Sequence, residues 1–225
     1  MKTNFSDFEL FSGISDEEGE KLLSCLESAR RIFQKGETIF SVGETTERLG
    51  LVLSGRVITE HNDYYGGRTI VGSAAHGAVF ALSYACVPGA KLPVNVVAAE
   101  ESEVLFLNVR KALVTCPETC PFHSKLVENL LTACAEKNLE LSRKILHTSP
   151  KTIRGKLLSL FSEYASKETG SFVVPFNRQQ LADFLGVDRS ALCAELSKMK
   201  RDGILDYRKN NFTLKRNAED EENAD

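Results

Sequence analysis

The sequence predicts an α+β fold with three parts in order: an N-terminal antiparallel β-roll, a long dimerisation helix and a C-terminal winged helix-turn-helix. Three observations predict this order. Short β-type runs separated by glycines fill residues 30–107, an unbroken helical pattern fills residues 122–147, and two capped helices with a hairpin pattern fill residues 177–212. Runs of this length and spacing favour antiparallel strands over alternating strand–helix units.

The composition is that of an ordinary soluble protein. The 225 residues are 42% hydrophobic and 26% charged, which suits one large or two modest domains. No apolar run approaches the roughly 20 residues that a membrane helix needs. The N-terminal residues MKTNFSDFEL lack the apolar core of a secretion signal. We therefore expect a cytoplasmic protein without a membrane partner.

Charge is unevenly distributed along the chain. The formal net charge is −3, yet residues 143–216 hold 15 Lys+Arg against 7 Asp+Glu. A basic C-terminal third on an acidic body is expected when only that end faces phosphates. Residues 217–225 are rich in acids and are expected to form a disordered tail.

Local signals mark the elements of the first domain, residues 1–120. Ser15 stands three residues before Glu18, a capping-box spacing that predicts the start of a helix. Beyond it, turns are predicted where glycines interrupt the β-type runs, at residues 35–37, 43–44, 54–55 and 66–67.

The helix predicted over residues 122–147 contains no glycine or proline and is apolar on more than one side. Such a helix must bury two faces. One face is expected to cover the β-roll and the other a second copy of itself, giving a homodimer in which Asn138 fixes the register. A helix wholly buried within a monomer is the alternative. Pro150 marks a hinge and favours a helix soon after it, and the next helix is predicted over residues 152–167, so residues 121–148 form the dimerisation helix and hinge.

Residues 149–216 are predicted to form the winged helix-turn-helix domain. Asn177 is a strong N-cap that Gln180 completes as a capping box, and Gly186 suits the left-handed end of that helix. Asp188 then caps the second helix. A hairpin wing is expected to turn at Asn210-Asn211. The alternative is two short helices and a hairpin within an unrelated core.

The second helix has one side suited to packing and one suited to a DNA groove. Helical periodicity separates Leu192, Leu196 and Met199 from the polar or small residues Ser190, Ala194, Ser197 and Arg201. Recognition helices place their N-terminal residues at base edges, where an arginine can bind guanine through two hydrogen bonds. Arg189 is therefore the expected base reader. The other expected DNA contacts are Ser190 and Ser197 beside it, and Arg178, Gln179, Lys198, Arg208 and Lys209 on phosphates.

Cysteines and histidines give no strong catalytic or metal signal. The six cysteines are scattered and expected to be reduced. Cys116 and Cys120 form a close pair beside His123, but no second pair stands at metal-binding spacing, so a proline-shaped turn is favoured. A redox- or metal-responsive role for this pair, or a redox role for Cys193, stays an alternative. The four dispersed histidines supply no cupin-like metal set, so we expect neither an enzyme nor a metal site.

The order of parts resembles the Crp/Fnr family of bacterial transcription regulators over nearly the whole chain. The resemblance is carried by LADFLGVDRSALCAELSKMKRDGIL, followed by KGETIFSVGE and GLVLSGRV of the cyclic-nucleotide-binding-like domain. It implies a homodimer that binds a two-fold-related DNA site near promoters, works with RNA polymerase, and is controlled by an effector in the β-roll. A small-molecule-binding module with vestigial DNA binding is the competing interpretation.

Departures from the family pattern bear on the effector. Nucleotide-binding members carry a Gly-Glu pair and an Arg-Ser or Arg-Thr pair where this chain has Ala81-Leu82 and Leu92-Pro93. Leucine and proline offer no side-chain donor to a phosphate, so cyclic AMP is not expected and the cofactor stays unknown. The resemblance places an apolar effector pocket at Phe80, Leu82, Tyr84, Leu92 and Val94. Ala194 also replaces a second arginine of many relatives.

Overall fold

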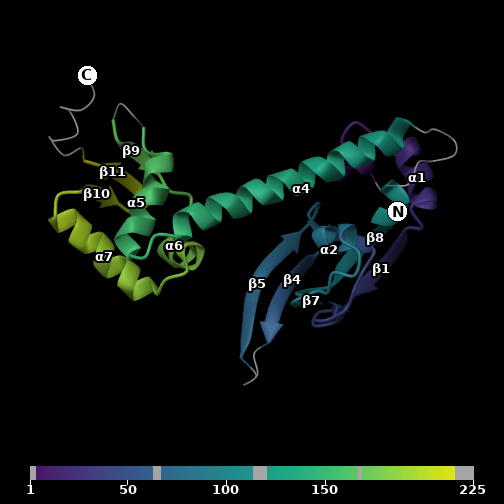
Figure 1. The fold of residues 1–225 in the computed structure, drawn as a ribbon, viewed down its shortest axis with the longest axis horizontal. Helices are drawn as coiled ribbons and strands as arrows, with labels where there is room; N and C mark the ends of the chain where they lie inside the picture. Colours follow the sequence, from purple (N-terminus) through teal and green to yellow (C-terminus); the bar gives the residue numbers. More distant parts are fainter. Residues whose placement is uncertain (1–3, 63–66, 114–120, 167–168, 216–225) are drawn as a thin grey trace. The chain divides into compact units, whose positions relative to one another are not determined.

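The computed structural model describes residues 4–62, 67–113, 121–166 and 169–215 (Figure 1). The chain forms two compact units that divide between Glu136 and Lys137. The division falls inside one long helix, and each unit is described here by itself. The domain limits expected at residues 120, 148 and 216 stay predictions, and the acidic tail lies outside the described residues.

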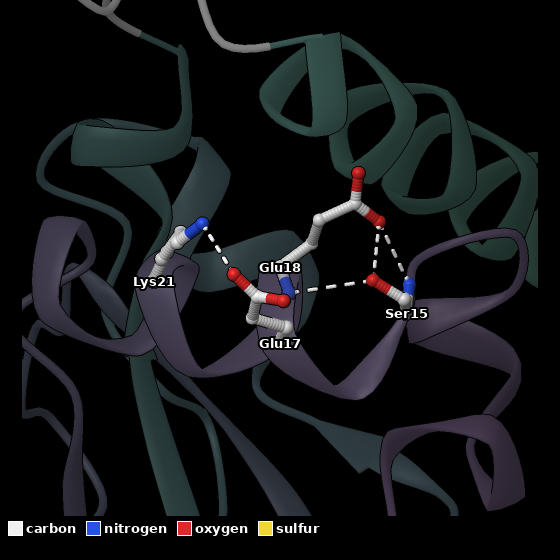
Figure 2. A network of polar contacts seen from close by, with 4 residues as sticks. All are labelled: Ser15, Glu17, Glu18 and Lys21. Carbon is white, nitrogen blue, oxygen red and sulfur yellow. Dashed lines mark hydrogen bonds and ion pairs between the residues drawn. The ribbon is translucent and has the colours of Figure 1, made fainter.

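The first unit begins with two 3-10 turns, η1 (Phe5–Asp7) and η2 (Glu9–Phe11), and the helix α1 (Asp16–Cys25). The predicted capping box is confirmed. The Ser15 hydroxyl accepts from the Glu18 backbone N–H, and the Glu18 carboxylate accepts from the Ser15 N–H at 2.9 Å. Figure 2 shows this pair beside the ion pair of Glu17 with Lys21.

Within the described part of the first unit, eight strands form its body, in the region where the glycine-punctuated runs predict strands. They are β1 (Ala29–Phe33), β2 (Thr38–Phe40), β3 (Arg48–Ser54), β4 (Arg56–Asn62), β5 (Arg68–Ala75), β6 (Val79–Phe80), β7 (Asn95–Ala98) and β8 (Ser102–Asn108). They pair antiparallel in two four-stranded sheets, ordered β1-β8-β3-β6 and β2-β7-β4-β5. Gly36, Gly43 and Gly55 sit at predicted turns with positive φ, whereas the turn at residues 66–67 lies partly outside the described residues.

Two apolar clusters fill this unit. One contains Phe33, Phe80 and Phe106 from the first of these sheets, packed with Val57 and Val96 from the second. The other lies among the N-terminal turns, α1, β3, β8, the short helices α2 (Leu82–Cys86) and α3 (Val109–Leu113), and the first half of α4 (Pro121–Thr148). The first half of the long helix is thus part of the first unit's core, as expected for one of its faces.

The helix α4 matches the prediction over residues 122–147 and is apolar on two sides. Leu126 and Leu130 are buried. Exposed apolar side chains stand elsewhere along it: Leu131, Leu139, Leu141, Ile145 and Leu146. The helix predicted from Thr152 is confirmed as α5 (Ile153–Tyr164), with Thr152 as its N-cap accepting from the Gly155 N–H. Its first helical residue is one later than predicted.

The second unit contains α5, β9 (Ser171–Val173), α6 (Arg178–Leu185), α7 (Arg189–Arg201), β10 (Leu205–Arg208) and β11 (Asn211–Leu214). The three strands form one sheet in the order β10-β11-β9. The rings of Phe161, Phe172 and Phe212 pack together beneath it. The winged helix-turn-helix is confirmed, with β9 as a third strand beside the hairpin.

The hairpin turn lies one residue earlier than predicted. Arg208 pairs with Asn211, so the loop consists of Lys209 and Asn210, and Lys209 adopts the left-handed conformation with φ of 55°. Asn211 is instead the first residue of β11 and pairs with Val173 on its other side. The pairing of Asn211 with residues on two neighbouring strands outweighs the preference of asparagine for turns, because this pairing fixes which residues remain for the loop.

Candidate nucleic-acid interface

Local backbone chemistry sets the turn between α6 and α7. Asn177 caps α6 and exchanges both capping-box hydrogen bonds with Gln180, each at 2.9 Å. Gly186 ends the helix in the left-handed conformation, with φ of 61°. Asp188 then caps α7 by accepting from the Ala191 N–H at 2.9 Å. These three predicted signals act at the predicted residues.

The Asp188 carboxylate also accepts a hydrogen bond from the Ser190 hydroxyl. That bond, followed by the bond from the Ala191 N–H, lowers the pKa of Asp188. The anion sits at the positive end of the α7 dipole, where negative charge is favoured. Ser190 is exposed, and because its hydroxyl donates to Asp188, its oxygen remains available only as an acceptor.

The outer face of α7 is exposed as the periodicity predicts. Leu192, Leu196 and Met199 are fully buried, whereas Arg189, Ser190, Ala194 and Lys198 are exposed and Ser197 is half-buried. The Ser197 hydroxyl donates to the Cys193 carbonyl of its own helix at 2.9 Å. Among the described residues, no hydrogen bond or ion pair engages the Arg189 side chain, so its donors are available to a partner.

Arg178 lies against the wing and is partly buried. Its Nη2 donates to the Lys209 carbonyl at 2.8 Å, and its guanidinium lies 5.1 Å from the Tyr207 ring centroid and 5.0 Å from that of Phe212. Its Nη1 is buried without a hydrogen-bond partner. The structure thus gives Arg178 a place in holding the wing to α6, while the predicted phosphate contact remains a prediction.

The other predicted phosphate ligands surround this arrangement. Gln179 is exposed and donates to Asp183 one turn along α6, at 2.8 Å. Arg208 and Lys209 are exposed at the tip of the wing. Arg178 joins the hairpin to the N-terminal end of α6, so Gln179 on α6 and the two basic residues of the wing are held on connected elements.

Sequence reasoning missed the residue that holds α7 in place. Arg154 on α5 donates through Nε to Glu195 and through Nη2 to Asp202, both at 2.6 Å. The bond to Glu195 is the larger cause that raises the pKa of Arg154. Lys156, also on α5, donates to the Leu185 carbonyl at 3.0 Å and so closes the C-terminal end of α6. The residues in these contacts are 29 to 48 positions apart in the sequence, so no local sequence pattern predicts them.

The expected effector residues do not gather into one cavity. Phe80 and Leu92 are buried in the aromatic cluster between the sheets, with Tyr84 packed beside it, whereas Leu82 belongs to the cluster under α4. The Phe80 ring makes edge contacts with Phe40 and Phe106 at centroid distances of 6.2 and 6.5 Å. Aromatic packing therefore fills the part of the roll where the resemblance places a ligand.

Val94 lines a separate cavity of about 50 Å³ together with the buried Glu60 carboxylate and Pro93. Glu60 forms an ion pair with Arg68 on β5. Pockets that hold drug-sized ligands have volumes of roughly 300–1,000 Å³, so this cavity fits none without rearrangement. Ala81, in the place of the family's glycine, adopts the left-handed conformation with φ of 59°.

The cysteine pair Cys116 and Cys120 lies outside the described residues. Of the other cysteines, Cys25 is exposed, and Cys86, Cys134 and Cys193 are partly buried and free. Within the described ranges, no three His, Cys, Asp or Glu residues lie close enough to hold a metal ion. In the same ranges, no helix is long and apolar enough to cross a membrane.

Two family models match the chain, in the order of its two units. The model of the cyclic nucleotide-binding domain matches residues 30–115, and that of the Crp-like helix-turn-helix domain matches residues 155–218. Together they cover well over half of the 225 residues. No curated protein matches the sequence.

Solved structures share this architecture at low sequence identity. CprK in complex with OCPA is 15% identical, with 87% of this chain and 91% of that chain covered and a TM-score of 0.57. The c-di-GMP responsive global regulator CLP of Xanthomonas campestris is 17% identical, with 88% and 99% covered and a TM-score of 0.51. The catabolite activator protein of Thermus thermophilus is 22% identical, with 95% and 97% covered and a TM-score of 0.47. Likeness at these identities concerns the fold.

Proposed function

We propose, because this chain belongs to the Crp/Fnr family of DNA-binding transcription regulators, that it works as a homodimer on a two-fold-related DNA site. Its signal enters through the β-roll and is not a cyclic nucleotide. RNA polymerase is the expected partner at the promoter.

One observation carries the DNA-binding proposal: Arg189 stands exposed and unengaged, within the described residues, at the N-terminal end of a helix whose opposite side is fully buried. This is the geometry by which a recognition helix presents a base-reading side chain to the major groove. Lys198, Arg208 and Lys209 add exposed positive charge on the same unit and are proposed to contact phosphates.

The exposed face of α4 supports the homodimer. By helical periodicity Leu131, Leu139, Leu141, Ile145 and Leu146 share one side of the helix, and Asn138 lies near the middle of that side. A second copy of the same helix would bury this stripe and pair Asn138 with its equivalent, which fixes register in coiled coils. Such self-complementary contacts are the rule in two-fold dimers.

The packing of the β-roll supports a signal other than a cyclic nucleotide. Leu82 is buried and Pro93 lacks a donor, at the two places where nucleotide-binding relatives hold the ribose and the phosphate. A phosphate buried there without charged donors would be strongly disfavoured.

Selection from random DNA followed by fluorescence anisotropy at fixed salt tests the DNA-binding proposal. We expect Arg189→Ala to lose about 1–3 kcal/mol of discrimination per half-site. The matched variant Arg208→Ala should weaken all sequences about equally, because phosphate contacts carry no sequence information. Unchanged discrimination by Arg189→Ala would reject Arg189 as the base reader, and selection of no DNA would favour the vestigial interpretation.

Sedimentation at micromolar concentration tests the dimer. Leu139→Glu should convert the dimer to a monomer, whereas Lys144→Glu on the opposite side of α4 should not. A wild-type monomer, or a Leu139→Glu dimer, would contradict the proposed interface.

A further inference from the structure

Ser190 is the second residue of α7 and lies on the outward face of that helix. By helical periodicity it stands opposite Leu192 and Met199, which are fully buried, and it is itself exposed. Ala194, one turn further along this face, is exposed and has no polar side-chain atom. Ser190 is therefore the first uncharged hydrogen-bonding side chain on the face that is proposed to meet DNA.

A serine hydroxyl can usually both donate and accept a hydrogen bond, so serine alone does not specify a base. In this chain the proton of Ser190 is already engaged. The Ser190 Oγ lies 2.5 Å from the Asp188 Oδ1, and an ionised carboxylate can only accept, so the Ser190 hydroxyl is the donor. The bond from Ser190, followed by the bond from the Ala191 N–H, lowers the pKa of Asp188 and so keeps its carboxylate ionised at neutral pH.

The carboxylate holds this proton more firmly than a base could. Hydrogen bonds to an ionised acceptor are about twice as strong as those to a neutral one, and the acceptors of a base edge are neutral. Asp188 is also fixed in place, because the same Oδ1 accepts from the Ala191 N–H at 2.9 Å and caps α7. The Ser190 oxygen therefore offers a partner lone pairs and no proton.

We propose that Ser190 reads a base that presents an amino group in the major groove, either cytosine through N4 or adenine through N6. Asp188 is the positioning residue, since it acts through the Ser190 hydroxyl without touching the base. This inference rests on the proposed function, in which α7 enters the major groove, and it names the class of base that α7 selects beside the guanine proposed for Arg189.

The base edges of the major groove allow this discrimination. Cytosine and adenine carry the amino donors there, whereas guanine and thymine present acceptors and the thymine methyl group. An oxygen that can only accept gains a hydrogen bond from the first two bases and faces the lone pairs of the other two. Asp188 thereby changes Ser190 from a residue that tolerates every base into one that separates two classes of base.

Double-mutant cycles between protein and DNA test the acceptor role. The full-length protein is titrated by fluorescence anisotropy at fixed salt with the site obtained by selection. At one position at a time in both half-sites, adenine is replaced by purine or cytosine by pyrimidin-2-one, which lack the amino group. At one position we expect the replacement to weaken binding by the parent about fivefold per half-site and by Ser190→Ala less than about twofold. Ser190→Thr, which keeps a hydroxyl, and the matched control Ser162→Ala, at an exposed serine of α5, should both behave as the parent does.

Two further substitutions separate the accepting from the donating role. 7-Deazapurines lack the N7 acceptor, so their effect on binding by the parent should not depend on Ser190. Asp188→Gly removes the carboxylate but keeps a residue suited to the N-cap. The freed Ser190 proton can then reach a base acceptor, so the preference among the four natural base pairs at the Ser190 position should fall from about fivefold to less than about twofold. If thermal unfolding shows that the glycine variant is not folded, Asp188→Asn, whose amide oxygen is neutral, replaces it and should shift the preference in the same direction.

An amino-group deletion that weakens the parent and Ser190→Ala equally at every position would overturn the acceptor role. A loss with 7-deazapurines that depends on Ser190 would show that the hydroxyl donates, and would overturn it as well. An unchanged base preference in a folded Asp188 variant would overturn the role of Asp188. A parent protein that selects no DNA sequence would instead contradict the proposed function.

Discussion

Replacing Arg178 by methionine distinguishes a residue that holds the wing from one that binds a phosphate. Methionine keeps an unbranched apolar stem of similar length against Tyr207 and Phe212, but it removes the guanidinium that contacts both rings and the Lys209 carbonyl. The wing is the part of the second unit that loses most, because the removed contacts all end on it.

The magnitude follows from the contacts. The charged hydrogen bond to the Lys209 carbonyl stabilises by about 1.5–3 kcal/mol, and the two ring contacts by about 0.5–1 kcal/mol each. Removing Nη1, which is buried without a partner, recovers roughly 1–3 kcal/mol. The net loss is therefore about 2 kcal/mol, and it is concentrated in residues 205–214.

Two measurements on the full-length protein report this result. Hydrogen exchange followed by mass spectrometry should show faster exchange of the β10 and β11 amides, about 30-fold for a local loss of 2 kcal/mol. The dependence of DNA affinity on salt should keep its slope, because no phosphate contact is lost. If Arg178 instead binds a phosphate, the slope should fall by about 0.9 for each lost contact. A reduced slope with unchanged wing exchange would refute the structural role.

Three further predictions concern backbone geometry and helix caps. Asn177→Ala should destabilise the second unit by about 1 kcal/mol and Asn177→Gly by a few tenths, measured by urea denaturation, and equal effects would contradict the cap. The pKa of Asp188 is lowered in the folded state, so its contribution to stability is present above its ordinary pKa and is lost as pH falls through the folded pKa. Asparagine caps a helix without titrating, so Asp188→Asn should make hydrogen exchange of the α7 amides less sensitive to acid. An unaltered pH profile of exchange would contradict this. Gly55→Ala should lower Tm by more than Gly43→Ala, although both glycines have positive φ. A Cβ at Gly55 would overlap the Glu101 carbonyl, whereas one at Gly43 meets nothing within 4 Å. A similar Tm for the two variants would show that the strand can shift.

Structural features that depend on a few neighbouring residues were predictable from the sequence. The capping boxes at Ser15 and Asn177, the left-handed Gly186 and the cap at Asp188 depend on contacts within three or four residues, so sequence spacing defines them. The buried stripe of α7 was predictable for the same reason, since helical periodicity relates its members. The helix predicted from Thr152 begins one residue later, at Ile153, because Thr152 is its N-cap.

Features that join distant segments were not predictable. Arg178 was interpreted as a phosphate ligand because its charge is visible in the sequence, whereas its contact with the Lys209 carbonyl, 31 residues away, is not. The Arg154 contacts with Glu195 and Asp202 have the same character. Likewise the five expected effector residues were placed by resemblance. Phe80, Tyr84 and Leu92 lie in or beside one cluster, Leu82 lies in another, and Val94 lines a separate small cavity.

The two carboxylates that Arg154 engages stand seven residues apart, nearly two helical turns, with Glu195 on α7 and Asp202 at its C-cap. They fix the helix about its own axis from the side that faces α5. The outward positions Arg189 and Ala194 take no part in that attachment. Under the proposed function, substitutions at these two positions therefore alter which DNA sequence is preferred while leaving the docking of the helix unchanged. A lineage could diversify its operators through a few surface codons, with little demand on the stability of the domain that carries them.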